Sequence, residues 1–496
     1  MPHDSPRIEA LVAQALAGRL NEAQARQLAG CDPELVALAL LALAQRIAQR
    51  DAHIARQAAR IAALQGAAAG TSPTPATPSG MIPVYAKPNV ESTRRRRKRP
   101  GAKNGHVGHH RPAPLRIDRR LEQRLKVCPC CGGALQRCNR TRTRITEDLP
   151  ETLQPVVTEH TIHRDYCPSC RKHVEPVVLE ALPHATLGHR VVGFSSWCHY
   201  GLGVTIDQLI DILQFHLQTK LSPGGLVAGW QRLADVLTPW YEQIAQEARH
   251  SAHLHADETG WRVQGQTCWL WCFANGQVCY YMIDRGRGSP VVQKFFGEAF
   301  KGILLHDFWS AYESIDAADR QYCLVHLLRE LEKVDEHNPS LEWRAFAKML
   351  RRLIRDGIRL RKRPDFAPEK YRSRITRIDG RLQTLIAAEC PDPDAQRLRK
   401  RLRRTADHIF TFLDHPAIPF ENNFAERMIR PAVILRKNSQ SNRSDQGART
   451  QAVLMSIFRT LKLRGHDPLQ TLEATLRTYL ETNQLPPLPA KIVAER

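Results

Sequence analysis

The 496-residue sequence predicts a multidomain α+β protein, in which helical and cysteine-rich modules precede an α/β domain built on a mixed sheet. Three observations predict it. Apolar residues recur every seven positions near the N-terminus, two C-x₂-C motifs follow, and from residue 253 the apolar pattern changes to that of strands. The length suggests about three domains, since a domain averages roughly 150 residues.

The N-terminal segment, residues 1–65, is rich in Ala and Leu and is expected to be helical. One position of a coiled-coil heptad is apolar throughout, at Leu40, Ile47, Ile54 and Ile61. The heptad position three residues further on is apolar in only two of the four repeats, at Leu43 and Leu64. The segment therefore either associates with a second copy, making a homo-oligomer, or docks on its own chain. Residues 66–93 are dominated by Gly, Ala, Ser, Thr and Pro, which is the composition of a flexible linker.

Positive charge is concentrated in two stretches. Residues 94–126 hold thirteen Lys and Arg against two Asp and Glu, and residues 341–404 hold twenty against eight. Such stretches usually face a polyanion, most often nucleic acid, although a basic surface kept for solubility is the alternative. Residues 94–127 are therefore expected to bind DNA. A nuclear-localisation signal is an alternative explanation of the same basic residues. The candidate DNA-binding residues here are Arg94, Arg95, Arg96, Arg97, Lys98, Arg99 and Lys103.

Residues 128–185 are expected to form a zinc-finger domain of the zinc-ribbon type. The predicted ligands of a structural Zn²⁺ are Cys128, Cys131, Cys167 and Cys170. Four thiolates leave no open coordination position, so the metal would not be catalytic. Cys130 and Cys138 are extra thiols that could compete as ligands, and four buried unliganded cysteines are the alternative. Alternating residues over 142–148 and 155–162 predict strands of the ribbon.

Residues 186–250 are expected to be helical. Ser222 and Pro223 supply the N-cap and the first-turn proline of a helix, which follows an apolar helical pattern over 204–218. Two short helices around a tight turn are typical of a helix-turn-helix that binds DNA or a second copy. A generic helical hairpin packed against the next domain fits equally well.

The catalytic domain is expected over residues 251–440. Strands are predicted at 253–259, 268–273 and 277–283, the last two joined by a type I′ turn at Asn275-Gly276. A helix near 290–296 and a buried strand over 302–307 complete a mixed sheet of the ribonuclease-H type. The domain is interrupted by an Arg-rich helical insertion, residues 340–415, expected to lie along DNA, and is followed by a C-terminal helical region, residues 441–496.

Acidic residues end two of these strands. If the strands are neighbours, the carboxylates of Asp257 and Asp307 converge, and such pairs suit Mg²⁺ or Mn²⁺. Two such ions activate an attacking hydroxyl and stabilise the leaving oxygen of a phosphodiester. A third acid, Glu426, is expected one turn into a helix capped by Asn422. Candidate phosphate-binding residues surround it, at Arg427, Arg430, Arg436 and Lys437.

These residues carry a resemblance to a known family. The sequence resembles transposases of the insertion-sequence-66 family over nearly the whole chain. The matching motifs are the paired C-x₂-C finger, His255 to Thr259 with Trp261, His306-Asp307 with Tyr312, Cys323 to His326, and Asn422 to Pro431 with Arg436, Lys437 and Ser444.

The resemblance implies a DDE-type ribonuclease-H fold in which Asp257, Asp307 and Glu426 are catalytic and bind two Mg²⁺ or Mn²⁺ ions. It also implies that the protein cuts transposon ends at terminal inverted repeats of double-stranded DNA and joins them to target DNA, with possible accessory proteins of the same element.

One residue departs from the family pattern. Glu421 stands where the family usually has Asp before the Asn pair, so a second acid lies five residues from Glu426. We favour Glu426, because its Glu-Arg pair follows the family pattern and Glu421 is expected to precede the helix cap. Glu258 is expected on the opposite face of its strand from Asp257, since side chains alternate along a strand. His326 approaches the site from its helix or is simply packed.

Two other functions fit the same residues. A zinc-ribbon regulator derived from such an enzyme would bind DNA without chemistry, although it would be free to lose the three acids that are present here. A structure-specific nuclease would leave free ends instead of joined strands. The longest uncharged apolar run, residues 35–44, is about half of a membrane span, so a cytoplasmic setting without membrane contact is expected.

Overall fold

The structure is a computed structural model. It describes residues 21–30, 33–69, 154–363 and 367–493, together with isolated positions between 11 and 14 and between 116 and 146. The chain forms two compact units, Met1–Thr77 and Pro78–Arg496. Among the described residues, no helix is both long and apolar enough to cross a membrane.

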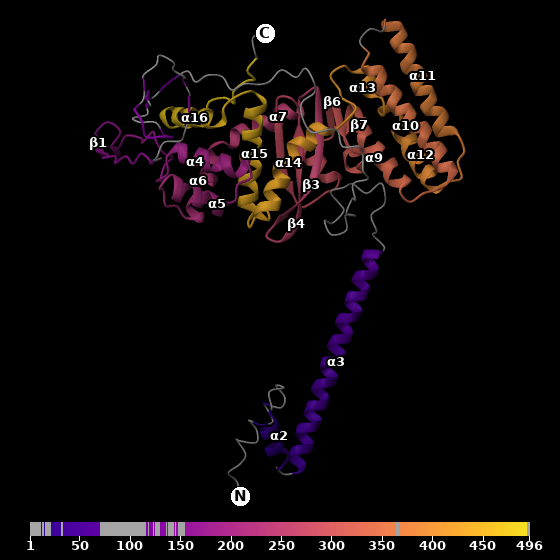
Figure 1. The fold of residues 1–496 in the computed structure, drawn as a ribbon, viewed down its shortest axis with the longest axis horizontal. Coiled ribbons are helices and arrows are strands. Elements are labelled where there is room, and N and C mark those ends of the chain that lie inside the picture. Colours follow the sequence, from indigo (N-terminus) through magenta and orange to yellow (C-terminus); the bar gives the residue numbers. More distant parts are fainter. Residues whose placement is uncertain are drawn as a thin grey trace. The chain divides into compact units, whose positions relative to one another are not determined.

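Among the described residues of the first unit lie the helices α2 (Glu22–Ala29) and α3 (Pro33–Ala69), drawn in indigo in Figure 1. Helix α3 continues four residues past the predicted end at residue 65, because Ala, the best helix former, fills positions 67–69. The predicted linker therefore starts too early, and its residues 70–93 lie outside the described part. Along α3 the heptad side chains of Leu40, Ile47 and Ile54 are exposed, so this position is open to a partner.

The second unit is built on a five-stranded mixed sheet. Its strands are β3 (His253–Val263), β4 (Gln266–Ala274), β5 (Cys279–Asp284), β6 (Ala299–His306) and β7 (Asp316–Tyr322). The order across the sheet is β5-β4-β3-β6-β7. Strand β4 is antiparallel to both neighbours, whereas β6 is parallel to β3 and β7. This mixed sheet is consistent with a ribonuclease-H-like transposase domain.

The two turns of the first three strands differ from the prediction. Type I′ geometry needs positive φ at both central residues, and Gln264 (φ 53°) and Gly265 (φ 74°) between β3 and β4 have it. Neither Asn275 nor Gly276 does, so the predicted type I′ turn there is wrong. Instead the Asn275 side-chain oxygen accepts hydrogen bonds from the backbone of Gln277 and Val278, at 2.9 and 3.0 Å. The Asn side chain holds a wider turn.

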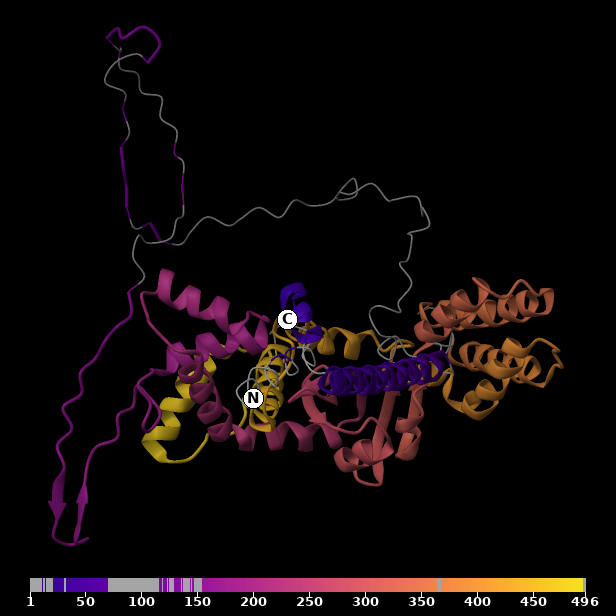
Figure 2. The same cartoon turned by 90° about the horizontal axis from the view of Figure 1, so that it is seen from below.

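Helices cover both faces of the sheet (Figures 1 and 2). On one face lie α7 (Thr238–Arg249) and α8 (Ser289–Phe296), where Phe295 stacks on Phe273 of β4 with ring centroids 4.1 Å apart. On the other face lie α14 (Asn423–Ser439) and α15 (Asp445–Leu463), and the Tyr281 hydroxyl of β5 donates to the Met428 carbonyl of α14. The sheet is thus buried on both sides, as its near-continuous apolar strands require.

The helical insertion follows α9 (Leu324–Asp335) and sits at the β7 edge of the sheet (Figure 1). It contains α10 (Leu341–Arg361), α11 (Pro368–Ala387), α12 (Pro393–Thr405) and the short α13 (Thr411–Asp414). Leu350, Leu382 and Leu398, one from each long helix, are buried in a common core. The predicted limits of residues 340 and 415 agree with these helices.

The segments before and after the sheet pack into the sheet's own core. They form α4 (His189–Ser196), α5 (Ile206–Asp211), α6 (Pro223–Val236) and α16 (Pro468–Thr482). Helix α6 begins as predicted, since the Ser222 hydroxyl accepts a hydrogen bond from the Gly225 amide at 3.1 Å. Its Trp230 is fully buried and donates to Ser195 of α4 at 2.9 Å. The α5–α6 pair is therefore anchored to the domain through α6.

Candidate active site

Two predicted site residues lie on neighbouring parallel strands, Asp257 in the middle of its strand and not near its end as predicted. Asp257 lies on β3, and Asp307 directly follows β6. Because His255 is paired with Leu305 in the register of these strands, Asp257 is level with Asp307 two residues further along. The structure therefore places these two residues side by side where β6 ends.

Both aspartates are half-buried, and they repel each other. Burial raises the pKa of Asp257 well above its usual value, and the negative charges of Glu258 and Asp307 raise it further. Burial also raises the pKa of Asp307, while the Trp309 amide, which donates to its carboxylate at 2.9 Å, and the guanidinium groups of Arg287 and Arg401 oppose the rise. A bound cation would relieve this repulsion, so the pair is suited to a positive ion.

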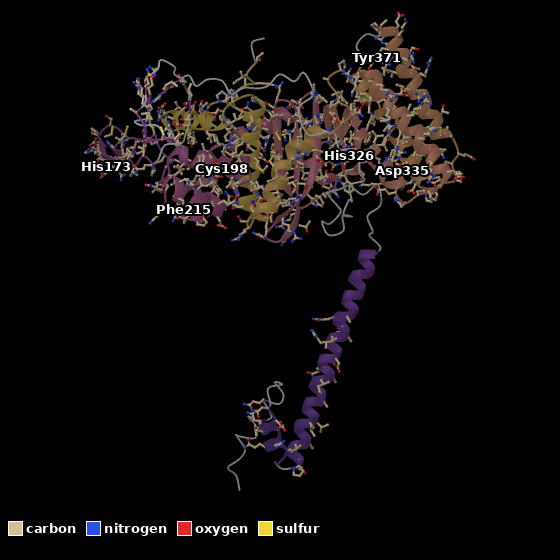
Figure 3. The ribbon with its side chains drawn as sticks, in the orientation of Figure 1. His173, Cys198, Phe215, His326, Asp335 and Tyr371 are labelled. Atoms are coloured by element: carbon tan, nitrogen blue, oxygen red, sulfur yellow. The ribbon has the colours of Figure 1, made fainter. Side chains whose placement is uncertain are left out.

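The third predicted acid, Glu426, lies in the first turn of α14. Its charge is among those that raise the pKa of both aspartates. The Glu426 Oε1 atom lies 3.6 Å from Nε2 of His326 and 3.6 Å from Nη1 of Arg329, yet it is buried and accepts no hydrogen bond. His326, labelled in Figure 3, thus borders the site from α9.

The start of α14 is fixed to β3 by one side chain. Asn422 occupies the N-cap position, but its side chain makes no capping bond, contrary to the prediction. Its amide instead donates to the Ala256 carbonyl at 2.7 Å and accepts from His255 Nδ1 at 2.9 Å. Burial lowers the pKa of His255 to about 4, so the ring is neutral at pH 7. Asn422 therefore sets the position of Glu426, while Glu421 precedes the cap.

Glu258, the residue after Asp257, belongs to a buried group of charged and aromatic side chains. Glu258 is 3% exposed at its side chain and pairs with Arg287 at 2.7 Å, and the Tyr312 hydroxyl donates to it at 2.6 Å. Arg287 lies between the rings of Trp269 and Trp309, at 4.3 and 4.2 Å from their centroids. The sequence analysis missed Arg287 and both tryptophans, because nothing in their spacing connects them with Glu258.

The predicted phosphate-binding residues of α14 divide into two groups. Arg427, Arg430 and Lys437 are exposed. Arg436 is half-buried, donates to the Thr259 hydroxyl at 3.2 Å and to the Gly260 carbonyl, and so ties α14 to β3. The structure therefore gives Arg436 a contact within the fold.

The zinc-ribbon residues are described only in part. Cys128, Arg94–Arg99 and Lys103 lie outside the described residues. Two short strands, β1 (Asp165–Cys167) and β2 (Lys172–Val174), form a hairpin around the second C-x₂-C motif. The strand predicted over 155–162 does not form. Hydrogen bonds from Cys170, including its backbone amide at 3.5 Å, lower the pKa of the Cys167 thiol, which favours the thiolate that a metal needs.

Among the described residues, no three His, Cys, Asp or Glu side chains stand close enough together to form a ready-made metal site. Glu426 Oε1 lies beside His326 and Arg329, and the Glu426 charge acts on both aspartates.

The comparison with protein families decides what this fold is. The family model described as Transposase IS66 family matches residues 184–450, more than half of the chain. The chain belongs to the Transposase IS66 family. The match includes β3, β6 and α14, so the Transposase IS66 domain contains all three predicted acids.

Two relatives of this IS66-family chain come from Sinorhizobium fredii. The uncharacterized protein y4jD is 25% identical over 443 residues, which cover 78% of this chain and 81% of the relative. The uncharacterized protein y4qI is 26% identical over 295 residues, or 51% of this chain and 52% of the relative. The first match extends beyond the family domain into the parts of the chain that flank it.

Proposed function

We propose that this transposase cuts and joins DNA at the ends of a mobile element by divalent-cation-dependent phosphoryl transfer. The observation that carries the proposal is that Asp307 and Glu426, at the end of β6 and in the first turn of α14, raise the pKa of Asp257 on β3 by their charge. The three carboxylates come from elements far apart in the sequence. Their mutual repulsion costs stability, which a catalytic role explains.

Mg²⁺ or Mn²⁺ fits these residues. Asp257 and Asp307 are half-buried and repel each other, and Glu426 holds a buried oxygen without a hydrogen bond. These three side chains would hold the ions, since hard divalent cations prefer carboxylate oxygens. When bound, two such ions supply an activated hydroxyl nucleophile and stabilise the leaving oxygen of a phosphodiester.

The chain's own basic residues would position the DNA. Arg427 and Arg430 are exposed on α14 within a turn of Glu426, and Arg329 lies beside it on α9. Guanidinium groups there would hold the phosphates that flank the reacting bond. Lys437 and the basic stretch at Arg94–Lys103 would add backbone contacts that carry no sequence information.

The other modules would assemble and orient the complex. The exposed heptad position of α3 would pair two copies as a coiled coil, giving a homo-oligomer that brings two DNA ends together. The α5–α6 pair would contact DNA or the partner copy, and accessory proteins of the same element would join the complex.

A structural zinc ion is proposed at Cys128, Cys131, Cys167 and Cys170. The lowered pKa of Cys167 supports it. We expect about one zinc per chain by elemental analysis of the purified protein, and clearly less after Cys167→Ser. Cys198, which is buried in the core, provides the matched control, and Cys198→Ser should retain the metal. Equal zinc content in the wild type and Cys167→Ser would remove this site.

The test of the function separates the two neighbouring glutamates. Strand transfer of a labelled transposon-end duplex is measured in Mg²⁺ or Mn²⁺ for the wild type, Glu426→Gln and Glu421→Gln. Glu426→Gln is expected to lose joining by about 10²-fold or more, because it removes a cation ligand, whereas Glu421→Gln should stay within a few-fold of the wild type. Duplex binding should persist in both variants.

Other results would lead to the alternative functions. Cleavage without joining would identify a nuclease. Duplex binding without any chemistry, even with accessory proteins supplied, would identify a regulator with an inactive fold. Loss of activity in Glu421→Gln, with Glu426→Gln active, would assign the third ligand to Glu421.

A further inference from the structure

Two sets of arginines in the helical insertion differ in their contacts, and the first set contacts other residues of the fold. On α12, Arg397 and Arg401 pair with Glu330 of α9 at 2.6 and 2.5 Å. Arg399 and Arg403 donate to the Ile386 carbonyl at the end of α11. These contacts fasten α12 to its neighbours. The four arginines of α12 therefore have a structural role within the fold.

The second set lines a groove of about 300 Å³ between α10 and α11. Five arginines and a single carboxylate form its walls: Arg359 and Arg363 from the end of α10, Arg374, Arg377 and Arg381 from α11, and Asp356. The spacing of three and four residues on α11 places its arginines on one side of the helix. Two rows of like charge therefore face each other across the groove.

The groove holds more positive charge than the chain neutralises. Asp356 lies 3.6 Å from Arg359 and 2.9 Å from Arg381, which uses its carboxylate. Arg363, Arg374 and Arg377 are exposed, and their side chains have no ion pair or hydrogen bond with any described residue. Like charges held this close repel, so an anion that enters the groove would stabilise the arrangement.

The positive charge continues along α10. Exposed basic side chains recur every three or four residues and lead into the groove, at Arg344, Lys348, Arg352, Arg355, Arg359 and Arg363. At 1.5 Å per residue this row is roughly 28 Å long, which is the length of about eight base pairs. A free phosphate or a nucleotide would occupy only one end of such a row, whereas a duplex backbone matches its full length.

We propose that the α10–α11 groove, with the basic row of α10, binds the phosphate backbone of double-stranded DNA during transposition. The proposal rests on the proposed function and names the surface of the insertion that holds the DNA. The two apolar lining residues, Leu360 and Ile378, are buried, so no exposed aromatic or apolar group in the groove is available to stack on bases. Binding here would be blind to sequence and strongly dependent on salt.

The test compares two double variants that each remove two exposed charges from the insertion. Arg374→Gln/Arg377→Gln removes two of the five positive charges that line the groove. Arg372→Gln/Lys400→Gln is the control, because Arg372 lies two residues before Arg374, on the other side of α11, and Lys400 lies on α12. Dissociation constants of the full chain for a labelled end duplex and a scrambled duplex are measured by fluorescence anisotropy over a series of salt concentrations.

The groove variant is expected to bind both duplexes about tenfold more weakly at 0.1 M salt and to lower the slope of log affinity against log salt by about two. The control should change neither by more than about twofold. Equal losses in the two double variants, or no loss in the groove variant, would overturn the proposal. A loss for the end duplex alone, or tighter binding of duplex RNA than of DNA, would also overturn it.

Failure of the groove is distinguishable from failure of the proposed function. If the wild type joins strands while the groove variant binds DNA normally, only the groove assignment is wrong. If the wild type binds no duplex and joins no strands, the proposed function itself fails. Thermal unfolding midpoints of the two double variants should match, since all four side chains are exposed and without a partner among the described residues.

Discussion

Replacing Asp307 with asparagine is expected to reduce strand transfer by about 10³-fold or more. The change removes one negative charge and keeps the shape, so the Trp309 amide still has an oxygen to which it can donate. An amide is a far weaker ligand than a carboxylate for a hard divalent cation, and cation chemistry is worth several kcal/mol in the transition state. Strand transfer in Mg²⁺ or Mn²⁺ is the measurement, and Asp257→Asn should behave alike.

The same variants have a second expected effect that separates function from folding. Burial and neighbouring charges raise the pKa of both aspartates, so ionised carboxylates at this site destabilise the metal-free fold. Asp307→Asn should therefore unfold at the same or a higher temperature than the wild type without divalent ions. Asp316→Asn, at an exposed position of β7, is the control and should leave strand transfer unchanged. Strand transfer within tenfold of the wild type in both site variants would refute the catalytic assignment.

Replacing Arg287 with alanine is expected to lower the free energy of unfolding by about 3–5 kcal/mol, because it leaves Glu258 buried and charged without its partner. The side chains of this pair are 10% and 3% exposed, and the change also removes a guanidinium stacked between Trp269 and Trp309. Urea denaturation followed by tryptophan fluorescence measures the loss.

An exposed ion pair of the same domain is the matched control. Lys294 pairs with Asp284 at 2.9 Å, but the Lys294 side chain is 66% exposed, so Lys294→Ala should cost less than about 1 kcal/mol. Adding Glu258→Gln to Arg287→Ala should recover part of the loss, since no buried charge then remains unpaired. Similar losses for Arg287→Ala and Lys294→Ala would show that the Glu258 pair is not the stabilising feature.

Much of the site could be predicted from local patterns. A buried apolar run that ends in Asp307 predicts a strand end, and the helical spacing after Asn422 predicts an acid in the first turn of a helix. Those patterns do not show which acids meet. The choice of Glu426 over Glu421 depended on family resemblance in the sequence, and it stays a prediction that the two Gln variants test; the Glu426 charge acts on both aspartates.

Some predictions failed where a side chain found a distant partner or where a turn depended on its own geometry. Asn422 was expected to cap its helix, but its amide reaches across to His255 and Ala256, about 166 positions earlier in the chain. The type I′ turn formed at Gln264-Gly265 instead of Asn275-Gly276, because the Asn275 side chain stabilises a different loop. Sequence spacing contains no information on such contacts.

The sequence by itself determined the elements with strong local periodicity: the long N-terminal helix, the strands that hold the two aspartates, and the limits of the insertion. It also determined the excess of positive charge. Only the tertiary structure decided how that charge is used: Arg397 and Arg401 of α12 pair with Glu330, whereas the arginines of the α10–α11 groove outnumber its one carboxylate. The physical reason is that periodicity follows from neighbours along the chain, whereas ion pairing and burial depend on which elements pack together.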